Sequence, residues 1–201
     1  MKFVAPWWDP EYADSGAHGA LAQKRTMQAA VGLCRQRRTA VDVGAHIGLW
    51  SAFLAERFEQ VCAFEPVSEN VTCYRQNVTA ANVDLYHCAL GDISATVHME
   101  KHGTNSGCWH CVDNGATPMT LLDEYEFLNV DLLKLDVEGL EGRVLNGARR
   151  TLEASWPVVV LEANGLGERL YGEDWLDPKV LLRHYGYAVR GRIRKDEIWS
   201  R

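Results

Sequence analysis

Acidic side chains stand at or near the carboxyl ends of several apolar segments of this sequence. They are Asp42, Glu65, Asp136, Glu138 and Glu162. If the segments are parallel strands, these acids meet at one edge of a sheet, which is where open α/β sheets bind ligands. Carboxylates in such a place can bind cationic groups and hydroxyl donors, and one of them can act as a general base.

Two glycines follow the first acid, in the stretch VDVGAHIGLW (41–50). Gly44 and Gly48 allow a sharp strand-to-helix turn that lies close to a ligand. Their G-x-x-x-G spacing differs from the G-x-G-x-x-G of dinucleotide sites, and the nearby Asp42 disfavours a pyrophosphate. Glu65 can accept both hydroxyls of a ribose, as an acid there also would in an NAD site. Together these features favour S-adenosylmethionine, which carries an ammonium and a sulfonium but no phosphate.

The segments that must position these residues alternate between apolar runs and runs with helical spacing. The predicted strands span 39–43, 60–66, 83–90, 130–139 and 157–165, with a terminal strand pair at 187–191 and 196–200. The predicted helices span 19–36, 48–58, 67–81, 141–154 and 178–185. The apolar runs lack polar alternation, as expected of strands that are covered on both faces. We therefore predict an α/β fold with a mainly parallel sheet between helices.

The middle of the chain departs from this alternation. Residues 95–101 (ATVHMEK) predict an edge strand, and residues 102–118 predict a long loop rich in Gly, Asn, Thr and Ser. Long loops inside a compact domain are commonly functional. We expect this loop to bind an acceptor molecule, with Asn105, Trp109 and His110 as the contacting residues.

Length and charge set the broad class of protein. The 201 residues suit one domain, and we expect a lid and helix over 1–36 before the α/β domain of 37–201. The net charge of −6 makes nucleic acid an unfavourable partner. Two basic stretches, 35–38 and 190–195, are interpreted as solvated faces.

Cysteine usage and the start of the chain indicate a compartment. Six cysteines, four of them in apolar context, predict free thiols in a reducing environment. The opening MKFVAPWWDP places Pro and Asp where a signal peptide needs an apolar core. No apolar run is long enough for a membrane span. We therefore expect a cytoplasmic protein.

Five segments resemble the FkbM-type methyltransferases, a branch of the class I S-adenosylmethionine-dependent enzymes. They are VDVGAHIG, AFEP, ALGD, LLKLDVEGLEGRVLNGA and VVVLEANG. The resemblance covers residues 38–164, with a weaker match at HYGY and DEIW near the end of the chain. It implies a Rossmann-like fold with a mainly parallel seven-stranded sheet between helices, and methyl transfer, commonly to a hydroxyl oxygen.

The resemblance also implies residue roles. The turn after the first strand would surround the methionine part, Glu65 the ribose, and Ala89 and Leu90 the adenine. The cofactor-binding set that this predicts is Asp42, Gly44, Ala45, His46, Gly48, Glu65, Ala89, Leu90 and Asp136. The chain departs from the family where His46 replaces a common Asn, and where the glycine-serine loop contains Cys108, Trp109, His110 and Cys111.

A hydroxyl acceptor needs a base within hydrogen-bond reach. The candidates are Asp136, Glu138, Glu162 and His46, and we predict Asp136 or Glu138 as the catalytic residue. Clustered carboxylates raise one another's pKa, which helps one of them to act near neutral pH. Glu162 is also expected to contact the acceptor.

Two groups of side chains could in principle bind a metal ion, but neither is expected to do so. Asp136, Glu162 and Asn164 offer oxygen ligands that magnesium or calcium would accept. A zinc site would have to be built from Cys108, Cys111, His102 and His110. Structural zinc usually takes two Cys-x-x-Cys pairs and the chain has one, so we predict no resident metal.

The sequence thus predicts an S-adenosylmethionine-dependent methyltransferase that acts on a hydroxyl of a sugar or another small acceptor. A dinucleotide-dependent oxidoreductase is an alternative, and it requires room for phosphates at the first turn. A non-enzymatic nucleotide-binding module is another. An RNA methyltransferase is the last, and it requires Arg190, Arg192 and Arg194 to cluster near Asp136.

Overall fold

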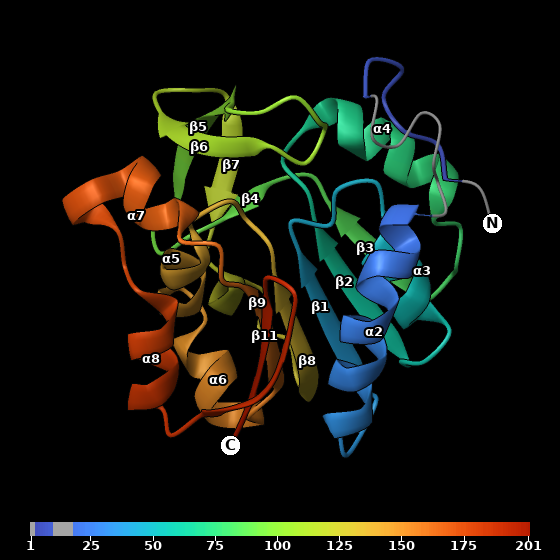
Figure 1. The fold of residues 1–201 in the computed structure, drawn as a ribbon, viewed down its shortest axis with the longest axis vertical. Coiled ribbons are helices and arrows are strands. Elements are labelled where there is room, and N and C mark those ends of the chain that lie inside the picture. The colour runs from blue at the N-terminus through green and yellow to red at the C-terminus, as the bar shows by residue number, and fades with distance from the viewer. Residues whose placement is uncertain (1–2, 10–17) are drawn as a thin grey trace.

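The computed structural model describes residues 3–9 and 18–201. Its main sheet contains β1 (Thr39–Val43), β2 (Gln60–Phe64), β3 (Val83–Tyr86), β8 (Val130–Leu135), β9 (Val158–Glu162), β10 (Ala188–Ile193) and β11 (Asp196–Ser200). The strand order is β10-β11-β9-β8-β1-β2-β3. Figure 1 shows β8, β1, β2 and β3 side by side. The pairs from β3 to β9 are parallel, whereas β11 runs antiparallel to both β9 and β10. The predicted mainly parallel seven-stranded sheet is confirmed.

Helices cover both faces of this sheet (Figure 1). One face packs against α2 (His18–Leu33), α3 (Leu49–Ala55) and α4 (Ser68–Asn77). The other face packs against α5 (Glu141–Asn146), α6 (Arg149–Ser155) and α8 (Pro178–His184). Burial on both faces is the reason that the strands are apolar without alternation. Within the described part of the chain, every helix is too short or too polar to cross a lipid bilayer.

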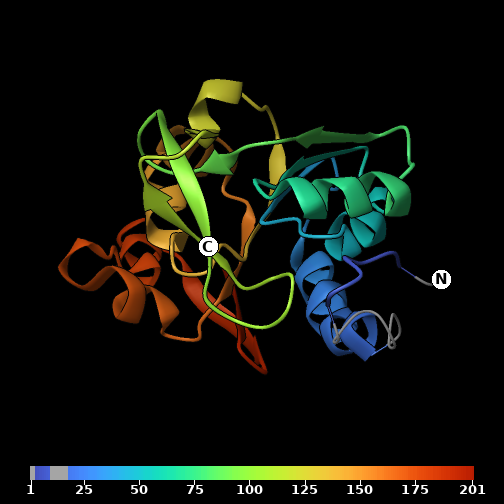
Figure 2. The same ribbon diagram turned by 90° about the horizontal axis from the view of Figure 1, so that it is seen from above.

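A second, four-stranded sheet overturns the prediction for the middle of the chain. It contains β4 (Ala89–Leu90), β5 (Ala95–Lys101), β6 (Trp109–Asp113) and β7 (Thr117–Thr120) in the order β4-β7-β5-β6. The predicted loop of 102–118 was wrong at β6 and at the start of β7, and β5 is an inner strand of this sheet. The antiparallel pairing of β5 with β6 supplies the hydrogen bonds, and local composition does not reveal that pairing. Figure 2 looks down on this sheet, which lies over the carboxyl edge of the main one.

Three other predicted segments differ from the structure in more than the positions of their ends. The predicted strand 83–90 divides into β3 and β4, which belong to different sheets. The predicted helix 141–154 breaks at Gly147, where a Cβ would lie 2.0 Å from the carbonyl oxygen of Gly91. The segment predicted as a loop after β9 contains α7 (Leu166–Tyr171) and a 3-10 turn, η2 (Gly172–Asp174). Another 3-10 turn, η1 (Leu122–Tyr125), precedes β8.

The N-terminal region has two described parts. The apolar side of α2, including Met27, Ala30 and Val31, is buried in the core of the main domain. Residues 3–9 run across α4, where the backbone N–H and C=O of Val4 bond to the side chain of Asn77. Residues 10–17 of the predicted lid lie outside the described residues. The division at residue 36 stays a prediction.

Candidate active site

A cavity of about 490 Å³ lies between the carboxyl edge of the main sheet and the second sheet. It opens beside the β1–β8 junction, where the strand order reverses and where α/β sheets bind ligands. Its volume is in the usual range for small-molecule sites. The predicted residues that line it are Gly44, Ala45, His46, Glu65, Ala89, Leu90, Asn105, Trp109, Asp136, Glu138 and Glu162. The predicted residues that do not line it are Asp42, Gly48 and His110.

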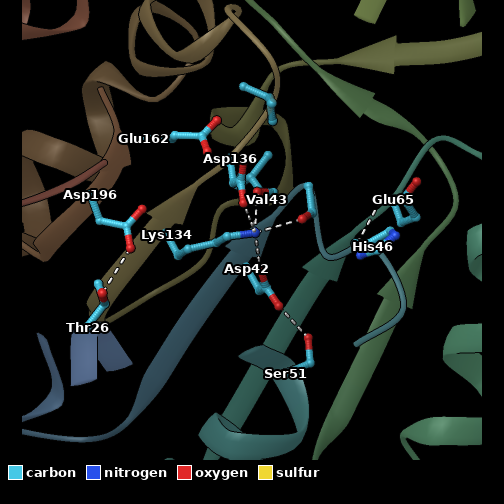
Figure 3. Close-up of polar contacts among 12 residues, drawn as sticks. Thr26, Asp42, Val43, His46, Ser51, Glu65, Lys134, Asp136, Glu162 and Asp196 are labelled. Carbon is cyan, nitrogen blue, oxygen red and sulfur yellow. Dashed lines mark hydrogen bonds and ion pairs between the residues drawn. The ribbon is translucent and has the colours of Figure 1, made fainter. Parts of the chain in front are cut away.

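Glu65 forms one end of the cavity and is 4% exposed. Its Oε2 accepts from the backbone N–H of His46 at 2.8 Å (Figure 3). Its Oε1 accepts from the backbone N–H of Val67 at 3.0 Å. Burial raises the pKa of Glu65 although these bonds favour the carboxylate. Asn70 donates to Oε1 at 3.1 Å, and its own Oδ1 is buried without a partner among the described residues. This end of the cavity therefore offers acceptors to a ligand that brings hydroxyl or amino donors.

Asp42 points away from the cavity. It is fully buried, and its Oδ2 accepts from the Ser51 hydroxyl at 2.7 Å. Its Oδ1 lies 3.1 Å from the Lys134 ammonium (Figure 3). The two residues are neighbours in the parallel register of β1 and β8, so they share one face of the sheet. Any effect of Asp42 on a ligand must therefore pass through Lys134.

The turn needs its two glycines because neighbouring segments of the protein pack closely against them. Gly44 has a φ of +73°, and a Cβ on it would lie 1.9 Å from the backbone oxygen of Asp136. Gly48 has a φ of +94° and packs against Tyr74 and Val78 of the α4 region. The N–H groups at the start of the turn bond to the neighbouring strand: Gly44 and Ala45 both donate to the carbonyl oxygen of Phe64 at the end of β2.

We expect Gly44→Ala to destabilise the protein. The left-handed backbone conformation costs a non-glycine residue about 1–3 kcal/mol, and the collision with Asp136 adds to that cost. The free energy of unfolding measured in urea should fall by at least about 2 kcal/mol. Gly32→Ala is the control, because no atom lies within 4 Å of its added Cβ in α2. An equal response of the two variants would contradict the packing described here.

Three acids gather at the other end of the cavity. Asp136, Glu138 and Glu162 each place a carboxylate oxygen within 4.8 Å of the others. Burial and the neighbouring Asp136 carboxylate raise the pKa of Glu138 to about 7. The backbone of Glu138 is left-handed, with a φ of +53°, and such strain is common at functional sites. Its Oε2 lies 3.4 Å from Nε2 of His102.

The other two acids of this cluster have cationic partners. Asp136 is part-exposed, and its Oδ2 lies 3.8 Å from the Lys134 ammonium. Glu162 is buried and pairs with Lys195, and it accepts from the Asn164 amide at 2.8 Å. Lys195 serves Glu162, whereas Lys134 is shared between Asp136 and the buried Asp42, so the cluster keeps a net negative charge. With its pKa raised to about 7, Glu138 can take up or release a proton near neutral pH.

Glu141 has a raised pKa but a different environment. It is buried at the start of α5 and does not line the cavity. Burial raises its pKa to about 7, although the N–H groups of Val137 and Gly139 donate to its Oε1 at 3.2 Å each. Glu141 therefore shapes the loop that carries Glu138.

The loop before β6 closes the cavity beside Glu65. His46 Nε2 lies 2.6 Å from the Ser106 hydroxyl, which itself donates to the Asp9 carboxylate. Asn70 also donates to the Ser106 carbonyl at 3.0 Å. Burial lowers the pKa of His46 to about 4, so its ring is neutral at neutral pH. Because His46 is tied into this closure, it is a poorer candidate base than Glu138.

Of the three residues of this region that were predicted to contact the methyl acceptor, two line the cavity and one does not. Asn105 and Trp109 line the cavity, and the buried indole N–H of Trp109 has no acceptor among the described residues. His110 lies behind them, with its ring 5.5 Å from that of His102. Cys108 and Cys111 also line the cavity, and the six cysteines, all of them among the described residues, form no disulfide bond with one another.

The structure adds residues that the sequence did not single out. Lys134, Asn70 and Ser106 belong to the site, and Asp9 reaches it from the N-terminal segment. The sequence contained a signal for Lys134, because a lysine stands inside the apolar run LLKL. The sequence contained no signal for Ser106 or Asp9, because only folding brings these two residues together.

The fold and the site define a Rossmann-like α/β protein with a ligand-sized cavity at the carboxyl edge of its parallel sheet. Within that class, a family model described as the methyltransferase FkbM domain matches residues 42–189. The chain belongs to this family and is a methyltransferase, as the resemblance of its motifs predicted. A comparison with curated proteins found no match.

Solved structures share the fold at low sequence identity. A methyltransferase FkbM from Methylobacillus flagellatus KT has a TM-score of 0.56 at 19% identity, over 85% of this chain and 45% of that chain. The present chain thus spans less than half of that relative. An rRNA methylase from Streptococcus thermophilus has a TM-score of 0.55 at 11% identity, over 90% of this chain and 96% of that chain. A Streptococcus mutans protein in complex with SAH has a TM-score of 0.54 at 12% identity, over 89% and 97% of the two chains.

Proposed function

We propose that this protein transfers the methyl group of S-adenosylmethionine to a hydroxyl of a sugar or another small acceptor. The observation that carries the proposal is one cavity with hydrogen-bond acceptors at one end and a carboxyl of raised pKa at the other. Glu65 and Asn70 would hold the ribose, with Ala89 and Leu90 beside the adenine. The partner is then a small molecule, and the compartment is the cytoplasm.

The orphan Oδ1 of Asn70 supports an adenosine ligand. Asn70 lines the cavity beside Glu65, and its buried Oδ1 needs a donor to offset its burial. Ribose hydroxyls or an adenine amino group supply such donors. The cationic amino-acid and sulfonium parts would lie toward Asp136, which carries negative charge.

Glu138 would be the general base. S-adenosylmethionine supplies an activated methyl group when bound, so the protein must orient the acceptor and remove its proton. A carboxylate whose pKa is near the working pH suits that task. Trp109 and Asn105, which line the same cavity, would hold the acceptor.

A dinucleotide is disfavoured by the first turn. The N–H groups of Gly44 and Ala45 donate to Phe64, and that of His46 donates to Glu65. A pyrophosphate would need such N–H groups for itself. The turn instead uses them to hold its own shape and the Glu65 carboxylate.

The arginines of the β10–β11 hairpin do not form the basic groove that an RNA acceptor would require. Arg192 pairs with Glu197 at 3.1 Å, and Arg190 bonds the Ser200 hydroxyl. Only Arg194 of the three predicted arginines lines the cavity. Three acids lie at the same mouth, and they would repel a phosphate backbone.

Ligand binding tests the cofactor. We expect the melting temperature to rise with S-adenosylhomocysteine and to stay unchanged with NAD at equal concentration, because only the former lacks phosphates. A rise with NAD alone would contradict the proposal. Incubation with methyl-labelled S-adenosylmethionine and cell extract, separated into small molecules and RNA, would then identify the acceptor. Label in the RNA fraction alone would replace the small-molecule acceptor by RNA.

A further inference from the structure

Lys134 is a buried cation at the junction of β1 and β8 (Figure 3). Its ammonium donates to the carbonyl oxygens of Gly44 at 2.6 Å and Val43 at 3.3 Å. It also lies 3.1 Å from Asp42 and 3.8 Å from Asp136. One side chain thus joins the end of β1, the glycine turn and the acid that follows β8.

Stability alone gives a weak reason for this cation. A buried ion pair costs desolvation, and apolar residues of similar volume often replace such pairs without loss. The same face of β8 carries Leu132 in the apolar core. Burial opposes the charge of Lys134, but Asp42 and Asp136 outweigh it and hold its pKa above the ordinary value. The lysine is therefore charged at a place where a methionine or leucine would pack.

The location of Lys134 gives a stronger reason. It lies in the cavity wall next to Gly44 and Asp136. An unbalanced ammonium here would repel a cationic ligand. Asp42 supplies the balancing charge from beneath the wall, so that the charge of Asp136 remains available to the cavity.

We propose that Lys134 is a positioning residue that fixes the Asp136 carboxylate and the Gly44 turn as acceptors for the ammonium of the cofactor's amino-acid part. Asp42 acts through Lys134 and does not touch the ligand. This inference rests on the proposed function, because it assigns one end of the proposed cofactor.

Two ligands separate positioning from general damage. S-adenosylhomocysteine carries the amino-acid group, whereas methylthioadenosine has the same adenosine part and lacks that group. A defect in positioning should weaken only the first. A collapsed cavity should weaken both.

The variants are chosen to keep the fold. Lys134→Met alone leaves Asp42 buried and unpaired, which is strongly destabilising. Lys134→Met combined with Asp42→Asn removes both charges, and the Asn oxygen can still accept from Ser51. Lys179→Met is the control, because Lys179 also pairs with an acid, Glu197 at 3.4 Å, away from the cavity. Urea unfolding and calorimetric affinities are measured for the wild type and all three variants.

The expected result is a folded double variant that binds S-adenosylhomocysteine about 10- to 100-fold more weakly, as for lost charged hydrogen bonds. Its affinity for methylthioadenosine should stay within about 2-fold of wild type, and Lys179→Met should bind both ligands normally. Unchanged affinity for both ligands, or an equal loss of both, would overturn the assignment. A wild type that binds neither ligand would overturn the proposed function, and this inference with it.

Discussion

Replacing Glu138 by glutamine is expected to lower kcat by about 10²- to 10⁴-fold, the usual contribution of a general base. Glutamine keeps the size of the side chain but cannot take the acceptor proton. The affinity for S-adenosylhomocysteine should change little, because Glu138 stands at the acceptor end of the cavity. Rates are measured with the acceptor that the labelling experiment identifies. Glu168→Gln, an exposed change on α7, is the control.

The pH dependence of kcat/KM should also report the ionisation of Glu138. Burial and Asp136 raise the pKa of Glu138 to about 7, and the base works only when it is ionised. For the wild type, kcat/KM should therefore rise with pH and level off above a midpoint near 7. A bound sulfonium favours the carboxylate, so the midpoint for kcat should lie at lower pH. If Glu138→Gln kept wild-type rates and the same midpoint, another group would be the base.

Replacing Glu65 by glutamine is expected to weaken S-adenosylhomocysteine binding by about 100-fold or more, since hydrogen bonds to a charged group contribute about 1.5–3 kcal/mol each. Two such bonds to the ribose hydroxyls are proposed. Glutamine keeps one of the two oxygens that accept from the His46 and Val67 N–H groups, so urea unfolding is measured as well to separate a loss of stability from a loss of ligand contacts. Affinity is measured by calorimetry, with Glu153→Gln on the exposed side of α6 as the control.

A modified ligand makes this test specific. A homocysteine derivative of deoxyadenosine lacks the ribose 2′-hydroxyl that an acid at this position binds. Wild type should bind it more weakly than the full ligand, and Glu65→Gln should discriminate much less between the two. Full discrimination by the variant would show that Glu65 does not hold the ribose.

Glu65 and Asp136 could be found in the sequence because both follow apolar runs. A strand buried on both faces must be apolar along its length, and Phe64 and Leu135 end such runs one residue before Glu65 and Asp136. Ligands bind at that edge of a parallel sheet. The position of Glu65 and Asp136 in the cavity wall therefore needed only local pattern and one general rule.

The strand β6 could not be predicted in the same way. Trp109 to Asp113 follow a polar, glycine-containing stretch, which locally favours a loop. Their extended form depends on hydrogen bonds to β5, such as the pairing of Met99 with Cys111. That pairing places Trp109 in the cavity wall and turns His110 away from it.

The sequence by itself determined the class of fold, the glycine turn and the acids at the strand ends, because periodicity and chain order are properties of neighbouring residues. Only the tertiary structure decided what each acid does. The register of β1 and β8 sets Lys134 beside Asp42 and so removes Asp42 from the cavity. Burial beside Asp136 gives Glu138 its raised pKa. Register and burial arise from contacts between distant segments, and the spacing of residues along one segment does not contain them.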